Sequence, residues 1–228
     1  SAVFPRRPES IFDGVEMPVT IMISRPSRPV LHTTRVCRFY TEERSTALET
    51  MAFAQHNIRL HDHRIAKIGS PLEVGIYQKM TVQSGALGSL TTSASTHVLY
   101  YQEACRYWAK SCVGMPFFQR NDEQMDPPHG RTLTFRDADS CAFAGCLVNS
   151  SLFYWFYSAF SDCEHINDVL IRDLKLPSMR NASTWIALET ELAKSQKHFA
   201  VRKTIHTKQG HKIDYDEMDA PKSKPIID

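Results

Sequence analysis

The feature that most restricts the fold of this sequence is residues 141–160, a run of 20 residues without a charged side chain. The run is long enough to span a membrane, but Asn149-Ser150-Ser151 lies at its centre and Asp162 follows its end. Asparagine and serine side chains compete for the hydrogen bonds of a helical backbone. We therefore predict no membrane segment, but a buried helical region over 140–161 that is bent or divided at this centre. Asp139 is the expected N-cap.

The composition is that of an ordinary globular protein, with 228 residues, of which 42% are hydrophobic and 23% charged. Such a chain can bury the core of one large domain or two small ones. The net charge is only +2, but basic residues are concentrated in two segments, residues 1–40 and 200–213. Local basic surface on a nearly neutral chain fits a polyanionic partner.

The six cysteines include no Cys-x-x-Cys pair, so we expect reduced thiols in a cytoplasmic protein. Two short clusters contain metal-ligand side chains, His61-Asp62-His63 and Cys163-Glu164-His165. Neither has a second ligand pair at the usual spacing, and we expect no metal site. No signal peptide is expected, because the first residues lack a continuous apolar core.

The N-terminal half contains patterns typical of short strands and capped helices. Residues 19–23 and 33–36 are rich in β-branched side chains and predict strands. Thr41 is the expected N-cap of a helix over about 42–56. Ser70-Pro71-Leu72-Glu73 combines serine at N-cap, proline at N1 and glutamate at N3, and predicts a second helix.

The C-terminal half predicts a strand at 98–101, a loop at 121–130 and a final helix that Asn181 caps and that ends near residue 199. Trp185, Leu188 and Leu192 should face inward on that helix. Residues 204–206 and 212–215 flank a turn with Gly210 and predict a β-hairpin. Four apolar side chains are expected to be buried: Leu147, Leu152, Trp155 and Leu174.

Catalytic motifs are missing from the sequence. There is no glycine-rich strand-to-helix turn for a cofactor, no nucleophile elbow and no phosphate loop. Asp126-Pro127-Pro128-His129 comes nearest to the motif that holds a flipped adenine, but its context is polar and histidine replaces the stacking aromatic residue. We interpret it as a surface turn and expect the chain to be non-catalytic.

Basic side chains suited to phosphate contacts are distributed along the whole chain. The hairpin is the strongest group, because its four Lys/Arg precede the first acid, Asp214, and are expected to be unopposed. Gln119, Asn121 and Gln124 are candidates for reading base edges. The candidate DNA-binding residues are Arg25, Arg28, Arg35, Lys67, Lys79, Arg120, Arg131, Arg202, Lys203, Lys208 and Lys212.

Two other features could be mistaken for binding equipment. Residues 153–157 are five consecutive aromatic side chains, and could form a platform for stacking bases. On a helix they must point in all directions, so we expect most of them in the core. Asn149 is expected to make buried hydrogen bonds rather than DNA contacts, because a buried amide must be satisfied.

Three blocks of sequence carry a resemblance to one family. Residues 146–155 read Cys-Leu-Val-Asn-Ser-Ser-Leu-Phe-Tyr-Trp, and residues 168–177 add a short Asp-to-Pro element about 20 residues further on. Residues 215–228 contain Ser-Lys-Pro-Ile-Ile-Asp. This combination resembles the target-recognition region of adenine-specific DNA methyltransferases of restriction-modification systems, in the type where one long chain both methylates and reads sequence.

The resemblance implies that the chain is a C-terminal fragment that recognises DNA, while an N-terminal methyltransferase domain of the parent chain binds S-adenosylmethionine. No cofactor is expected in this fragment. Its partners would be double-stranded DNA and that methyltransferase domain, with no membrane. We expect a single α+β domain over residues 1–228, with mixed short strands, about five helices and a sub-boundary near 121–138.

Two alternatives remain open from the sequence. The chain could be a protein-interaction or scaffold domain of a phage-defence assembly, in which its basic surface meets no specific ligand. It could also be a complete small enzyme with an unfamiliar site, although the missing motifs disfavour this. Salt-dependent DNA binding separates the first hypothesis from the scaffold, and cofactor binding would support the enzyme.

Overall fold

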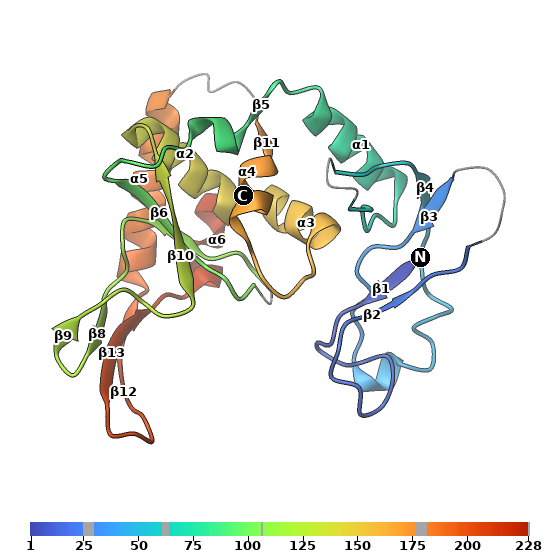
Figure 1. Ribbon diagram of the computed structural model, residues 1–228, viewed down its shortest axis with the longest axis horizontal. Coiled ribbons are helices and arrows are strands. Elements are labelled where there is room, and N and C mark those ends of the chain that lie inside the picture. Colours follow the sequence, from blue (N-terminus) through green and yellow to red (C-terminus); the bar gives the residue numbers. More distant parts are fainter. Residues whose placement is uncertain (25–29, 61–63, 106, 177–181, 228) are drawn as a thin grey trace. The chain divides into compact units, whose positions relative to one another are not determined.

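The computed structural model describes residues 1–24, 30–60, 64–105, 107–176 and 182–227. The chain divides into two compact units. Unit 1 comprises Ser1–Gln83 and Phe156–Cys163, and unit 2 comprises Ser84–Trp155 and Glu164–Asp228. We expected one domain with a sub-boundary near 121–138, but all residues of that range lie within unit 2. The described residues form six α-helices and small antiparallel sheets, which confirms the α+β class (Figure 1).

Unit 1 contains two short antiparallel pairs. β1 pairs with β2 and β3 with β4, the bounds being Ala2–Phe4, Val19–Ile21, Leu31–Thr33 and Ala54–His56. Phe4 and Phe39 meet edge to face, with ring centroids 6.4 Å apart, inside a small cluster with Ala2 and Ala47. The predicted strands at 19–23 and 33–36 are therefore present only in shortened or shifted form.

The predicted helix over 42–56 is wrong. The chain forms only a 3-10 turn, Thr41–Glu43, then irregular turns and strand β4. The Thr46 hydroxyl donates a hydrogen bond to the Glu43 carbonyl, and the Thr50 hydroxyl donates one to the Thr46 carbonyl, each at 3.2 Å. Such local bonds offer the backbone an alternative to helix. Leu48, in the middle of this range, is exposed.

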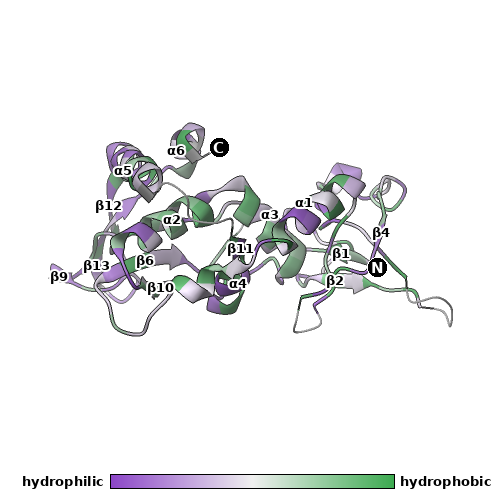
Figure 2. Cartoon of the chain, turned by 90° about the horizontal axis from the view of Figure 1, so that it is seen from above, coloured by the Kyte–Doolittle hydropathy of each residue, from purple (hydrophilic) through white to green (hydrophobic). Residues whose placement is uncertain are grey.

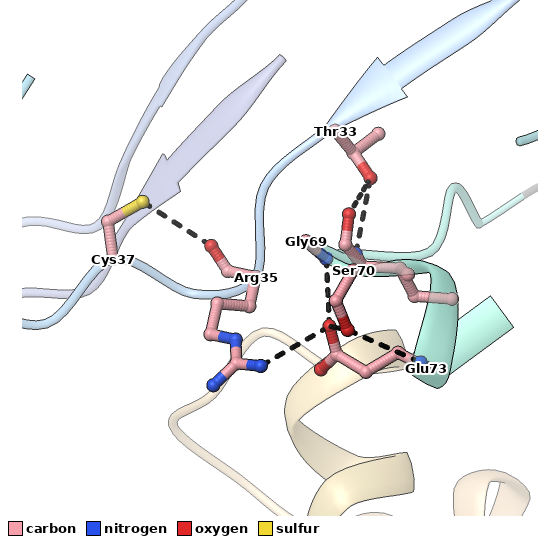
Figure 3. A network of polar contacts seen from close by, with 7 residues as sticks. Thr33, Arg35, Cys37, Gly69, Ser70 and Glu73 are labelled. Carbon is pink, nitrogen blue, oxygen red and sulfur yellow. Dashed lines mark hydrogen bonds and ion pairs between the residues drawn. The ribbon is translucent and has the colours of Figure 1, made fainter. Parts of the chain in front are cut away.

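Helix α1 (Pro71–Thr81) begins at the predicted residue. The Ser70 hydroxyl accepts a hydrogen bond from the Glu73 amide at 3.3 Å, and a Glu73 carboxylate oxygen accepts one from the Gly69 amide at 2.9 Å (Figure 3). Gly69 lies close to another segment, since a Cβ there would be 2.8 Å from the Arg35 amide nitrogen. The capping box is confirmed, with its carboxylate reaching one residue further back than the usual pattern.

Unit 2 is built around a three-stranded and a four-stranded sheet. The first has the order β10-β6-β7, with bounds Gly130–Phe135, His97–Gln102 and Ser111–Val113. The second has the order β12-β13-β8-β9, with bounds Val201–His206, Lys212–Glu217, Phe118–Arg120 and Glu123–Gln124. A short pair joins β5 (Gly85–Ala86) to β11 (Lys175–Leu176). The predicted strand at 98–101 and the predicted hairpin, β12–β13, are confirmed.

The uncharged run of the sequence folds into two helices, α2 (Ala138–Asn149) and α3 (Ser151–Phe160), as predicted. Ser150 separates them: its backbone is extended, its hydroxyl donates to the Leu147 carbonyl at 2.6 Å, and the same oxygen accepts from the Phe153 amide at 3.2 Å. The N-cap prediction is wrong, because Asp137 and not Asp139 accepts the capping bond, from the Ser140 amide at 2.7 Å.

Three further helices complete unit 2, α4 (Asp168–Asp173), α5 (Ala182–His198) and α6 (Ala220–Ile227). α5 packs against both α2 and α6. On α5, Leu192 is buried as predicted, whereas Trp185 and Leu188 are half-buried. The predicted cap, Asn181, lies outside the described residues.

The burial predictions for the apolar run are half correct. Leu147 and Leu174 are buried, but Leu152 is 37% exposed and Trp155 is only half-buried. Phe153, Phe156 and Tyr157 are the buried members of the aromatic cluster, so three of its five side chains are buried, as expected for most of them. Figure 2 shows the corresponding contrast in hydropathy, with α2 mostly hydrophobic and the β12–β13 hairpin mostly hydrophilic.

Unit 1 buries a histidine whose hydrogen bonds fix the tautomer of its neutral ring. His56 Nδ1 accepts from the Ile58 amide at 3.0 Å, so the proton of the neutral ring is on Nε2, which lies 2.7 Å from the Thr33 hydroxyl. That hydroxyl in turn donates to the Ile68 carbonyl at 2.8 Å. Burial, and then the positive charges of His32 and the N-terminus, lower the pKa of His56 below its ordinary value of 6.5.

This histidine should make unit 1 less stable in mild acid. Because the folded-state pKa is the lower one, the unfolded chain binds more protons as the pH falls through about 6.5, and stability present above that pH is lost below it. We expect the thermal midpoint of the wild type to fall between a pH of about 7.5 and 5.5 by more than that of His56→Gln. Thermal melts followed by circular dichroism test this, and parallel pH profiles of the two proteins would contradict it.

Candidate nucleic-acid interface and adjoining pocket

The described candidate DNA-binding residues are divided between the two units. Arg25 and Arg28 lie outside the described residues. Arg35, Lys67 and Lys79 belong to unit 1. The remaining six belong to unit 2, and five of these lie on or beside the four-stranded sheet: Arg120, Arg202, Lys203, Lys208 and Lys212.

The cations of unit 1 serve its own structure in two cases of three. Arg35 Nη2 lies 3.6 Å from the same Glu73 carboxylate that caps α1, and Figure 3 shows the two side chains directed toward each other. Lys67 Nζ donates to the Ser161 carbonyl at 2.5 Å, and burial lowers its pKa. Only Lys79, on α1, is exposed without such a bond in the part of the chain that the structure describes.

The prediction that the hairpin cations are unopposed is wrong for three of the four. Arg202 Nε lies 2.5 Å from Asp216, and Lys203 Nζ lies 3.5 Å from Glu217. Lys212 Nζ approaches two acids, Asp122 at 2.8 Å and Asp214 at 3.1 Å. Three of these four pairs join residues far apart in the sequence, because antiparallel pairing places Asp216, Glu217 and Asp122 beside cations 14 to 90 positions away.

Two cations of this sheet remain outside ion pairs among the described residues. Arg120 ends β8 with an exposed side chain, and Lys208 lies exposed in the turn between β12 and β13. Figure 1 shows that turn at the far end of the hairpin from the helices of unit 2. Phosphate contacts by this sheet would therefore depend first on these two side chains, since neither would have to break an ion pair with an acidic side chain to bind a phosphate.

Arg131 is held in a separate network on β10. Its Nε lies 2.5 Å from Glu103, and its Nη1 lies 3.9 Å from Asp168. Asp168 also accepts a short hydrogen bond from the buried Tyr101 hydroxyl. Burial and these bonds to Asp168 raise the pKa of Tyr101, so the network joins β6, β10 and the start of α4 around a neutral phenol.

The three side chains predicted to read base edges differ in whether their amides are already hydrogen-bonded. The Asn121 amide is occupied, because its oxygen accepts from the Lys212 amide at 3.0 Å and its nitrogen lies 3.1 Å from His211 Nδ1. Gln119 and Gln124 are paired in register across β8 and β9, and Gln124 is exposed. We therefore keep the two glutamines as candidates and regard Asn121 as a residue that fixes the turn.

A cavity of about 470 Å³ lies between the two sheets of unit 2 and the helices α2, α5 and α6. Its size is within the usual range of small-molecule sites, about 300–1,000 Å³. Aromatic rings and prolines line much of it, among them Tyr100, Phe118, Pro128 and Tyr215. Burial raises the pKa of Tyr100, so this phenol is neutral at physiological pH.

Asn149 lines this cavity and is buried and hydrogen-bonded, as predicted, with 3% of its surface exposed. Its Nδ2 lies 2.8 Å from the Gly145 carbonyl, 2.8 Å from the Ser111 hydroxyl and 3.1 Å from the Ser111 carbonyl. Its Oδ1 accepts from the Ser111 amide at 3.3 Å. The side chain thus ties the last turn of α2 to β7.

The sequence analysis identified neither this cavity nor Gln196, which is one of its lining residues. Gln196 Nε2 donates to the Ser111 carbonyl at 3.0 Å and lines the cavity from α5. The alternation of Ile213 and Tyr215 with charged residues was a signal for one apolar face on β13. Asp126-Pro127-Pro128-His129 forms an exposed turn, as expected, but both prolines also line the cavity.

The structure also bears on metal, thiol and membrane features. The cluster His61-Asp62-His63 lies outside the described residues. Among the described residues, no three His, Cys, Asp or Glu side chains lie close enough together to hold a metal ion, and this applies to Cys163-Glu164-His165 as well. All six cysteines are free thiols. None of the helices in the described segments has the length and apolarity required to cross a membrane.

Comparisons with known proteins found no relative, since no protein-family model, no curated protein and no solved structure matches this chain.

Proposed function

We propose that this chain recognises a DNA target within an S-adenosylmethionine-dependent adenine-N6 DNA methyltransferase of a restriction-modification system, whose catalytic domain lies outside the chain. The observation that carries the proposal is the exposed strand β12, with Lys208 in the turn after it and the exposed Arg120 at the end of β8, neither cation being in an ion pair among the described residues. The resemblance of residues 146–155, 168–177 and 215–228 to the target-recognition region supports it independently. In this function the chain works in the cytoplasm, as its free thiols favour.

The β12–β13 hairpin has a shape that suits groove binding, because a two-stranded ribbon fits the major groove of B-DNA. All six residues of β12 are exposed, and Lys208 lies at the turn. Phosphate contacts by Lys208 and Arg120 would fix the position of the ribbon, while Gln119 and Gln124 offer amides to base edges. Base flipping and methyl transfer would belong to the rest of the enzyme.

One observation favours a second candidate, a protein-interaction or scaffold domain. Three of the four hairpin cations are neutralised by Asp216, Glu217, Asp122 and Asp214. A surface of paired charges has a weaker field than a basic patch, which reduces attraction to any polyanion. The scaffold hypothesis predicts no salt-dependent DNA affinity.

A salt titration of duplex DNA binding tests the proposal. We expect the double variant Arg120→Ala, Lys208→Ala to lower the slope of log affinity against log salt by up to about 1.8, because each lost phosphate contact removes about 0.9. The loss should be similar for all duplex sequences, since phosphate contacts carry no base information.

Lys203→Ala is the matched control on the same hairpin, because Lys203 is paired with Glu217. We expect it to leave the slope nearly unchanged. Equal slopes for wild type and double variant, or no DNA binding by the wild type at all, would refute the DNA proposal and leave the scaffold as the better candidate.

A further inference from the structure

One wall of the cavity is the inner face of the four-stranded sheet. Residues directly opposite each other on paired strands share a face, and two such pairs line the cavity. Tyr215 of β13 lies opposite Phe118 of β8, and Ile213 of β13 lies opposite Ile205 of β12. Charged residues on β13 alternate with these apolar ones. The sheet therefore presents two aromatic rings and two aliphatic side chains toward the same space.

Tyr100, on β6 of the other sheet, supplies a further aromatic ring. This ring lies against the backbone of Gly130, since a Cβ added there would be 2.1 Å from the Tyr100 Cε2 atom. Only glycine allows the ring to take this position. A flat aromatic ligand would thus meet rings from both sheets, which is the kind of contact that stacks bases regardless of their identity.

Gln196 gives the cavity a hydrogen-bonding group of fixed orientation. Because its amide nitrogen donates to the Ser111 carbonyl, the amide cannot turn over without losing this bond. The nitrogen retains a second N–H, and no donor among the described residues contacts the Gln196 oxygen. An amide that offers a donor beside an acceptor matches the amino group and ring nitrogen of adenine.

The charges lining the cavity do not favour a phosphate group. The charged residues that line the space are Asp216, Glu217 and Lys110, and the two acids form ion pairs with Arg202 and Lys203. These ion pairs leave Lys110 as the one lining residue that would attract a phosphate, which is a single charge and not a cationic cluster. An uncharged ligand suits this lining better.

We propose that this cavity binds a nucleobase, stacked among Tyr100, Phe118 and Tyr215 and held at its amino edge by the Gln196 amide. The same chemistry is available from a free nucleoside and from an unpaired base of a DNA strand. The proposal does not depend on DNA binding by Arg120 and Lys208, because neither of them lines the pocket and the pocket is complete within unit 2.

Calorimetry of the full chain with adenosine tests the first source, with ribose as the comparison ligand. We expect adenosine to bind and ribose not to bind, because only the base can stack and reach the amide. Gln196→Leu should weaken adenosine binding by about tenfold, since it leaves the amino group of the ligand without an acceptor. Gln209→Leu, in the exposed hairpin turn, is the matched control and should bind as the wild type does.

Two further variants remove the stacking surface. Tyr215→Ala should weaken adenosine binding at least about fivefold. Gly130→Ala should weaken it as well, because the added Cβ displaces the Tyr100 ring from the wall. A thermal melt of each variant establishes that it is folded, and if Gln196→Leu fails to fold, Tyr215→Ala decides the question.

The second source is tested with two duplexes that differ only by one unpaired adenine. Tighter binding of the duplex with the unpaired adenine, with the gain lost in Gln196→Leu, assigns the pocket to an extruded base. Binding of adenosine without such a gain assigns it to a free nucleoside. If neither adenosine nor the unpaired adenine binds, or if Gln196→Leu and Tyr215→Ala both leave binding unchanged, the proposal is overturned.

Discussion

Phe143→Ala is expected to lower the free energy of unfolding of unit 2 by about 3–5 kcal/mol, the range for truncation of a fully buried phenylalanine. Phe143 has no exposed surface and lies on α2, where it contacts the Trp185 ring edge to face with centroids 4.7 Å apart. The cavity left behind would separate α2 from α5 at their contact. Rigid helices on both sides limit how far such a cavity can collapse.

Urea unfolding followed by tryptophan fluorescence measures this effect, because all three tryptophans of the chain lie in unit 2. Leu152→Ala is the matched control, taken from the same uncharged run of the sequence but 37% exposed. It should cost less than about 1 kcal/mol, as substitutions on the surface usually do. Similar losses in the two variants would mean that the α2–α5 contact is not a rigid core.

The parts of the fold that the sequence predicts correctly depend on local chemistry. The capping box at Ser70 lies in four consecutive residues, and the break at Ser150 comes from its own hydroxyl and backbone. The β12–β13 hairpin is likewise determined by a turn with Gly210, which adopts a positive φ of 83°. In each case the interactions that decide the structure are among neighbours in the sequence.

The failures have two causes, one local and one tertiary. The helix expected over 42–56 has acceptable helical spacing, but the hydroxyls of Thr46 and Thr50 bond to nearby carbonyls instead. Leu152 and Phe153 are neighbours in an apolar run, and only the tertiary packing of α3 decides that the first is exposed and the second buried. Hydrophobicity alone could not separate them.

The candidate site was the least predictable part, because it is made by strand register. In the sequence, four basic residues of the hairpin precede its first acid. In the folded sheet, strand pairing places Asp216 beside Arg202 and Asp122 beside Lys212. The cavity has the same origin, since it joins residues from β6 to α6. Only the buried role of Asn149 was predicted there, from the rule that a buried amide must be hydrogen-bonded.

The Asn149 amide is expected to contribute strongly to stability: Asn149→Ala should lower the free energy of unfolding of unit 2 by about 3 kcal/mol. The substitution leaves the buried Ser111 amide without its acceptor and removes the link between α2 and β7. Ser111→Ala is the graded comparison: it removes only the hydroxyl, which lies 2.8 Å from Asn149 Nδ2, and keeps both backbone bonds, so it should cost about 1 kcal/mol. The same urea titrations measure both variants. If Asn149→Ala costs no more than Ser111→Ala, the hydrogen bonds between the Asn149 amide and the Ser111 backbone contribute nothing to the stability of unit 2, and packing alone holds the amide in place.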